Sequence, residues 1–138
     1  MGILRIEADV KHLETVQNFV IAELEKANFS LKQIMQVEIA VEEIFCNIAN
    51  YAYHPDKGDT WIQCKIRREG KERVEIKFID EGIPYNPLEK EDPDISLSLE
   101  EREIGGLGIY LTKQLMDSME YHHDNGRNIL IITKKKED

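Results

Sequence analysis

Apolar residues recur at helical spacing in three parts of the chain, and this pattern predicts three helices. The first covers residues 10–27. The second begins after Ser30, whose hydroxyl is suited to capping a helix N-terminus, and continues to about Tyr53. The third covers residues 106–117. The remaining ordered segments follow a different period.

Elsewhere apolar and polar residues alternate, which is the pattern of strands with one buried face. The predicted strands cover residues 3–6, 62–67, 74–79, 118–123 and 128–135. The second and third form a hairpin about Glu69-Gly70-Lys71, and the last two are joined by Asp124-Asn125-Gly126. The order of these elements predicts an α+β fold in a single domain, residues 1–138, without an internal repeat.

One long segment has neither period. Residues 85–104 contain two prolines and many acidic side chains. A structureless stretch of about 20 residues inside a compact domain is usually functional and often forms a lid. We therefore expect a lid over about residues 85–105, although the acidic run is equally the pattern of a solubilising surface.

Composition and charge argue against several classes of protein. The chain has 138 residues, of which 41% are hydrophobic and 33% charged, as in a soluble globular protein with a real core. No apolar run reaches the roughly 20 residues that span a bilayer, and no signal peptide is evident. The formal charge of −9 argues against direct nucleic-acid binding. Cys46 and Cys64 have no CxxC spacing and lie in apolar segments, so we expect buried, reduced thiols and a cytoplasmic protein.

The first candidate motif lies in the second predicted helix. Glu43, Asn47 and Asn50 stand at i, i+4 and i+7 and therefore share one helix face. Such a face is ordinarily just solvated. If another element covers it, the carboxylate can orient an attacking hydroxyl as a general base, and an amide oxygen can hold magnesium, which prefers oxygen ligands.

The second motif follows a predicted strand. Asp80 ends that strand, and Gly82 and Pro84 then force a turn. A partly buried aspartate here can accept a hydrogen bond from an exocyclic amine, which adenine has and guanine replaces with a carbonyl at the equivalent position. Gly82 would let the backbone approach the base closely. The alternative is an ordinary Asp-Glu-Gly turn.

The third motif places three glycines, Gly105, Gly106 and Gly108, at the start of the third helix. Backbone N–H groups at a helix N-terminus bind phosphate oxygens, whereas a hinge or a tight helix entry would need the same residues. Neither a GxxxxGK[ST] sequence nor a GxGxxG sequence after a strand is present. A nucleotide site in this chain is therefore neither a P-loop nor a Rossmann site.

Taken together, Glu43-x-x-x-Asn47, Asp80-x-Gly82-x-Pro84 and Gly105-Gly106-Leu107-Gly108-Ile109 resemble the signature of the gyrase, chaperone and histidine-kinase ATPase superfamily. Within it, residues 40–53 and 101–111 are most similar to bacterial anti-sigma-factor serine/threonine kinases. The resemblance implies a Bergerat-type two-layer α/β sandwich. Its mixed, mostly antiparallel sheet carries about three helices on one face, with ATP held between helices and a lid.

The resemblance also implies residue roles. Glu43 becomes the catalytic base, Asn47 a nucleotide contact and magnesium ligand, and Asp80 the contact to the adenine amine. The remaining ATP-contacting positions are Gly82, Arg102 in the lid, Gly105, Gly106, Leu107 and Gly108. Two departures stand out: Tyr51 replaces a histidine frequent in these kinases, and Gly126-Arg127-Asn128 replaces a Gly-Thr found in many superfamily members.

The function implied is an ATP- and magnesium-dependent serine/threonine kinase that phosphorylates a small antagonist protein and binds a sigma factor. A homodimer is the oligomeric state that the family suggests. The alternative is an ATP-responsive protein-binding module with little or no kinase activity, because the same three motifs support both.

Overall fold

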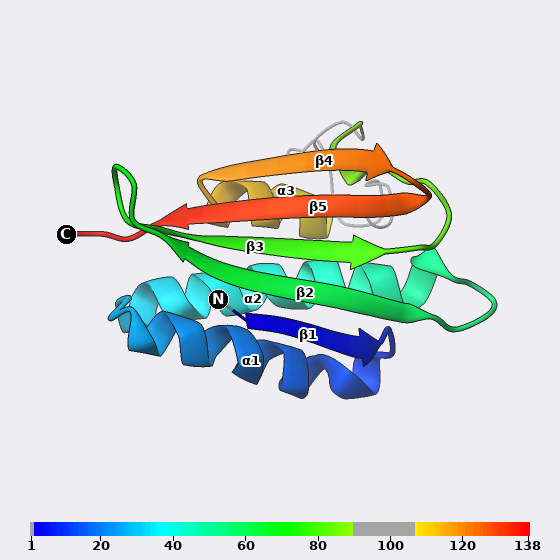
Figure 1. The fold of residues 1–138 in the computed structure, drawn as a ribbon, viewed down its shortest axis with the longest axis horizontal. Helices are drawn as coiled ribbons and strands as arrows, with labels where there is room; N and C mark the ends of the chain where they lie inside the picture. The colour runs from blue at the N-terminus through cyan, green and yellow to red at the C-terminus, as the bar shows by residue number, and fades with distance from the viewer. Residues whose placement is uncertain (1, 90–106) are drawn as a thin grey trace.

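The computed structural model describes residues 2–89 and 107–138, which form a sheet with helices against one of its faces (Figure 1). The strands are β1 (Gly2–Glu7), β2 (Asp59–Arg67), β3 (Arg73–Asp80), β4 (Ser118–Asp124) and β5 (Arg127–Lys135). They form one sheet in the order β1-β2-β3-β5-β4, and all four pairings are antiparallel, so the described sheet is antiparallel throughout and not mixed as predicted. The predicted strands are confirmed, each to within a few residues at its ends.

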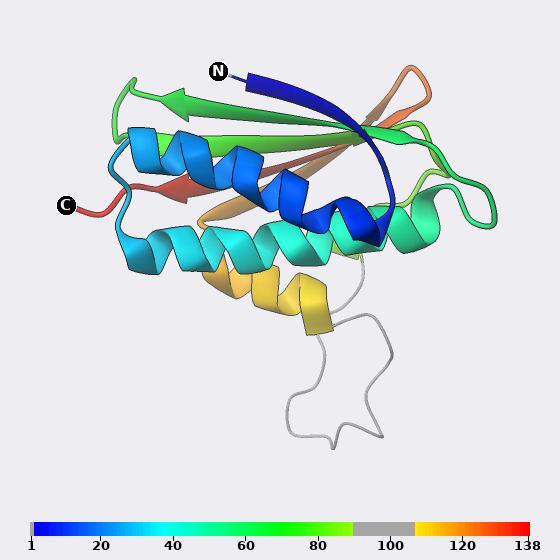
Figure 2. The same cartoon turned by 90° about the horizontal axis from the view of Figure 1, so that it is seen from below.

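The helices are α1 (Leu13–Lys26), α2 (Leu31–Asn47) and α3 (Leu107–Leu115). The view in Figure 2 shows all three on the same side of the sheet, with α2 between α1 and α3. The other face of the sheet carries no described helix. The predicted α+β class, with about three helices on one face, is therefore confirmed. No helix in the described part of the chain is both long and apolar enough to cross a membrane.

Two predicted helices differ in detail from the structure. The first begins with a short 3-10 turn, η1 (Val10–His12), before α1. Ser30 caps α2 as expected, because its Oγ accepts a hydrogen bond from the Gln33 N–H at 3.1 Å. The α-helical part of the second helix ends at Asn47, and residues 48–52 continue as a wider π turn, η2 (Ile48–Ala52).

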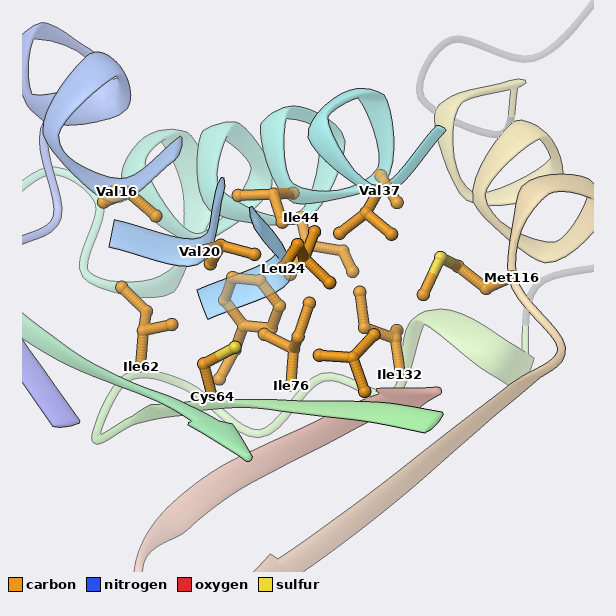
Figure 3. Close-up of a cluster of buried hydrophobic side chains, with 14 of the residues drawn as sticks. Val16, Val20, Leu24, Val37, Ile44, Ile62, Cys64, Ile76, Met116 and Ile132 are labelled. Carbon is orange, nitrogen blue, oxygen red and sulfur yellow. The ribbon is translucent and has the colours of Figure 1, made fainter. Parts of the chain in front are cut away.

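The core lies between the sheet and the helices. Figure 3 shows side chains from α1, such as Val20 and Leu24, meeting Ile44 of α2 above Ile76 and Ile132 of the sheet. All of these side chains are at most 2% exposed. Burial of an aliphatic side chain contributes about 1.5–3 kcal/mol, so this shared core holds the helices on the sheet.

The thiols only partly match expectation. Cys64 faces the core and is buried, and burial raises the pKa of its thiol to about 12. Cys46 is free as predicted but only half-buried, so the prediction of a buried thiol is wrong there. The physical reason is helical phase, because Cys46 stands four residues after the exposed Glu42 on the outer side of α2.

The last hairpin brings two polar side chains to one end of the sheet. Asn125 and Gly126 have φ values of 50° and 76°, the left-handed pair that a tight two-residue turn requires. The resulting register of β5 on β3 places Asn128 directly opposite Asp80. Both residues are buried, at 6% and 5% exposure. The fold thus pairs the predicted base-recognition residue with an amide that the sequence did not assign.

Candidate functional site

A pocket of about 340 Å³ opens at this end of the sheet, beneath the end of α2. Its described lining is mostly apolar and aromatic, and Asp80 is the only described lining residue that carries a charge. The lining residues are Ile44, Asn47, Ile48, Tyr51, Ala52, Phe78, Asp80, Ile83, Tyr85, Pro87, Ile109, Tyr121, Asn128 and Leu130. An apolar cavity with a few convergent polar groups is the usual form of a small-molecule site.

Asp80 lines this pocket, and one of its two carboxylate oxygens is hydrogen-bonded within the protein. Its Oδ1 accepts hydrogen bonds from the Gly82 N–H and from Asn128 Nδ2, both at 2.9 Å. No residue in 2–89 or 107–138 donates to Oδ2. Burial raises the pKa of the Asp80 carboxyl, and the two hydrogen bonds act against that rise. The site therefore presents a carboxylate oxygen that can receive a donor from a ligand.

Gly82 brings the loop after β3 against the end of the second helix. A Cβ at this position would lie 2.2 Å from the Ala52 carbonyl oxygen, which is far inside contact distance. The neighbouring Ile83 N–H donates to that same oxygen at 2.9 Å. This bond satisfies a carbonyl that a helix end leaves unpaired. Gly82 was predicted to admit the base, and the described structure shows that the glycine is first required by the protein backbone.

The Tyr53 hydroxyl links the loop after Asp80 to the start of β2. It donates to the Asp59 carbonyl at 2.6 Å and accepts from the Glu81 N–H at 2.7 Å. These bonds link the end of η2 to the start of β2 and to the residue after Asp80. Asp80 is thus held in place by the pairing of β3 with β5 and by two hydrogen bonds of the loop that follows it, from Ile83 N–H to Ala52 and from Glu81 N–H to Tyr53.

Glu43 and Asn47 are the next site residues, one turn apart on α2. Both are half-buried, and Asn47 lines the pocket. A Cβ at Gly108 would lie 2.1 Å from Glu43 Oε2, so the glycine leaves the space that this carboxylate occupies. In the described residues, neither side chain has a hydrogen bond or an ion pair. Helix α3 therefore covers part of the face that would otherwise be solvated.

Asn50 does not join this group. It is exposed and does not line the pocket in the described part of the chain, although the i+7 spacing placed it beside Asn47. That spacing assumes an α-helical period throughout, whereas residues 48–52 form the wider π turn. Tyr51 takes the place in the pocket lining instead.

Three predicted nucleotide contacts, Arg102, Gly105 and Gly106, lie outside the described residues, as does most of the predicted lid. Of that lid, residues 85–89 are described and include the short 3-10 turn η3 (Pro87–Glu89). Leu107 is the first residue of α3. The structure therefore places Glu43, Asn47, Asp80, Gly82 and Gly108 around one end of the sheet.

Comparisons with known proteins agree with this geometry. Residues 6–134 match the model of the histidine kinase-like ATPase domain. The chain belongs to this family. Over 132 residues it is 29% identical to the serine-protein kinases RsbW of Bacillus cereus (strain AH187) and Bacillus thuringiensis subsp. konkukian, which covers 93% of this chain and 81% of each relative. The predicted resemblance to this superfamily, and within it to bacterial anti-sigma-factor serine/threonine kinases, is confirmed.

Solved structures show the same fold. The RsbU and RsbW domains of a Mycobacterium tuberculosis protein match with a TM-score of 0.66 at 17% identity, covering 99% of this chain. This chain spans only 33% of that structure. The histidine kinase domain of the blue-light activated kinase EL346 from Erythrobacter litoralis matches with a TM-score of 0.54 at 14% identity, covering 92% of this chain and 60% of that one.

Membership in the histidine kinase-like ATPase family identifies ATP as the ligand class of this domain. Sequence reasoning assigned no role to the amide at position 128 or to the aromatic side chains near it. One signal was available. Asn128 occupies a core-facing position of β5, where Leu130 and Ile132 are apolar, and a polar group at such a position needs partners.

Proposed function

We propose that this chain is an ATP-dependent protein serine kinase of the RsbW type, which phosphorylates a small antagonist protein and binds a sigma factor in the cytoplasm, as a homodimer. The observation that carries the catalytic part is the position of Glu43. Its carboxylate lies against Gly108 at the start of α3, one helical turn from the pocket-lining Asn47. The names of the Bacillus relatives support the same activity.

Base recognition is assigned to Asp80, whose Oδ2 accepts a hydrogen bond from the exocyclic amine of adenine. Gly82 supports this residue through the loop that it allows. Phosphate contacts are assigned to the start of α3, at Leu107 and Gly108, and to Arg102, Gly105 and Gly106, which precede it in the sequence. Exposed N–H groups at a helix N-terminus favour anionic ligands.

The phosphate transfer needs a single base. The serine hydroxyl oxygen of the antagonist forms a bond to the γ-phosphorus of ATP as the bond from that phosphorus to the ADP oxygen breaks. Glu43 accepts the hydroxyl proton, so ADP and a phosphoserine are the products. A positioned base of this kind contributes typically about 10²–10⁴-fold to a rate.

Asn47 is suited to hold magnesium. Its side chain lines the pocket and has no hydrogen-bond partner among the described residues. No cluster of three acidic, histidine or cysteine side chains capable of holding a metal occurs in residues 2–89 and 107–138. This donor set fits an ion that keeps waters and phosphate oxygens as ligands rather than one held in a protein cage. When bound, magnesium offsets the negative charge of the phosphates.

A second function is supported by a specific observation, because Glu43 does not itself line the described pocket. In that case the chain is an ATP-responsive binding module with little or no transfer activity. The two functions differ in one measurable step, which is the movement of the γ-phosphoryl group.

The test measures transfer of radiolabelled phosphate from ATP to a small antagonist protein encoded beside this chain. We expect Glu43→Ala to lose transfer by at least about 10²-fold while ATP binding is retained. Glu42→Ala is the matched control, since Glu42 is the adjacent carboxylate and is exposed. Normal transfer by Glu43→Ala would refute the assigned base. Binding of ATP without transfer by the wild type would favour the binding module.

A further inference from the structure

The side-chain amide of Asn128 is bonded in both of its halves. Its Nδ2 donates to Asp80 Oδ1 at 2.9 Å and to the Ile83 carbonyl at 2.9 Å. Its Oδ1 accepts from the Tyr121 hydroxyl and, at 3.4 Å, from the Tyr85 N–H. The residue is 6% exposed. Both N–H donors and the acceptor oxygen of the Asn128 amide therefore have hydrogen-bond partners within the protein.

These partners fix which way the amide points. The Ile83 carbonyl can only accept, and the Tyr85 N–H can only donate, so turning the amide over would break both contacts. The NH₂ group must face Asp80 as a result. Tyr121, which reaches the amide from β4, holds the oxygen half in place.

The fixed amide determines which oxygen of Asp80 is free. Oδ1 receives both the Asn128 NH₂ and the Gly82 N–H. Among the described residues, Oδ2 receives nothing, and Asp80 lines the pocket. We propose that Asn128, held by Tyr121, is a positioning residue that directs the free oxygen of Asp80 to the ligand as an acceptor and thereby selects a purine with an exocyclic amine. This inference rests on the proposed binding of ATP.

The same contact favours the ionised form of the carboxyl group. Burial raises the pKa of Asp80, and the hydrogen bond from Asn128 lowers it. Loss of that donor must therefore raise the pKa further. The described titratable groups near it are Tyr51 from η2, Tyr53 just after η2, Glu81 and Tyr85 from the loop, Glu89 from η3, and Tyr121 and His123 from β4.

Two of these neighbours, Tyr53 and Tyr121, do not obscure the carboxyl titration. Burial raises the pKa values of Tyr53 and Tyr121, so both stay neutral in the acidic and neutral range. His123 lines a separate hollow beside Tyr121 and Tyr85 and is exposed. The experiment is repeated in a His123→Gln background, which removes this imidazole from the comparison.

The experiment measures affinity by calorimetry for ATP and for inosine triphosphate, in which a carbonyl replaces the amine, between about pH 5 and pH 8. The variants are Asn128→Ala, which loses the donor, Asn128→Ser, which keeps one donor, and Tyr121→Phe, which loses the anchor. Asn125→Asp is the control, because it lies in the exposed turn of the same hairpin. All comparisons use the same ligands, so titration of the phosphates cancels.

We expect the wild type to prefer ATP by roughly 10- to 100-fold. Affinity for ATP falls as pH drops through the pKa of Asp80. In Asn128→Ala the preference falls by about tenfold or more, and the loss of affinity begins at a higher pH. Asn128→Ser recovers part of both effects, Tyr121→Phe shows a smaller shift in the same direction, and Asn125→Asp shows none.

A role confined to stability would lower the melting temperature of Asn128→Ala and leave the pH profile and the ATP preference unchanged, and that result would overturn the inference. If Asn128→Ala does not fold, Tyr121→Phe decides by the same two readouts. Failure of the wild type to bind ATP would overturn the proposed function as well. Binding that is lost in Asp80→Asn but unaffected by either Asn128 variant would overturn this inference alone.

Discussion

The two ends of the candidate site are built differently. At the sheet end, Asp80 is paired in register with Asn128 and bonded to the loop through Gly82. At the helix end, Glu43 lies against Gly108 with no hydrogen bond or ion pair in the described residues. One end is thus held by directional bonds between strands and a loop, and the other by the close packing of two helices.

This difference separates the residues that recognise the base from the residue that assists phosphate transfer. Directional bonds on a sheet hold an acceptor in place before any ligand arrives, which limits the ordering cost of binding. A half-buried carboxylate on a helix keeps rotamer freedom until its partners are present. The account therefore predicts that base binding and phosphate transfer respond separately to substitution, and the following variants test that separation.

The largest effect is expected at Gly108. In Gly108→Ala the new Cβ meets Glu43 Oε2 at 2.1 Å, which is the mobile end of a flexible side chain. The carboxylate swings aside at little cost to folding, but a misplacement of about 1 Å can lower a rate roughly 10²-fold. Transfer assays should show that loss with ATP affinity nearly unchanged, whereas Gln114→Ala, at an exposed position farther along α3, should have no effect. Full activity in Gly108→Ala would contradict the described packing.

Gly82→Ala should differ from Gly108→Ala, because it should lower both stability and ATP affinity. Here the Cβ meets the Ala52 carbonyl at 2.2 Å, and backbone cannot move aside as a side-chain end does. We expect a loss of about 1–3 kcal/mol in the free energy of unfolding, together with weaker ATP binding, because the loop that supports Asp80 must shift. Urea denaturation and calorimetry check both.

Ser30→Ala separates stability from site geometry. The Ser30 hydroxyl caps α2 at the end far from the pocket, and its loss should cost about 1 kcal/mol. ATP affinity should stay unchanged at temperatures where the protein remains folded. A parallel fall in affinity would mean that global stability, rather than local geometry, controls the sheet end.

The smallest expected effect concerns pH. The pKa of Asp80 is raised in the folded protein, chiefly by burial, so the folded state holds its proton more tightly than the unfolded state. Stability from this residue is fully present below the ordinary aspartate value, about 3.9, and is lost as pH rises through the raised pKa. The unfolding free energy of Asp80→Asn relative to wild type should therefore increase with pH over that range and then level off. A difference that is constant with pH would contradict the raised pKa.

Much of this architecture could be predicted from sequence. Period-two and helical patterns located the strands and helices, because burial on one face forces those periods. The Ser30 cap and the Asn125-Gly126 turn followed from local backbone chemistry that needs no tertiary context. The three motifs also indicated the family, which the match over residues 6–134 confirms.

The rest depended on contacts between distant segments. Asn128 lies 48 residues from Asp80, and only the strand order β3-β5 makes them neighbours. The proximity of Gly82 to Ala52 and of Gly108 to Glu43 arises in the same way. Asn50 was placed by an α-helical period that the π turn at residues 48–52 interrupts, and no local signal indicated that turn.

The central claim is that Asp80 recognises the exocyclic amine of adenine. In Asp80→Asn, the amide oxygen can keep the bonds from Gly82 and Asn128, which turns a donor toward the ligand in place of an acceptor. Calorimetric titration of wild type and Asp80→Asn with ATP and GTP tests this directly. The account predicts that the wild type binds ATP at least about tenfold more tightly than GTP and that the variant loses this preference while remaining folded. Equal affinity of the wild type for both nucleotides, or an unchanged preference in Asp80→Asn, would contradict it.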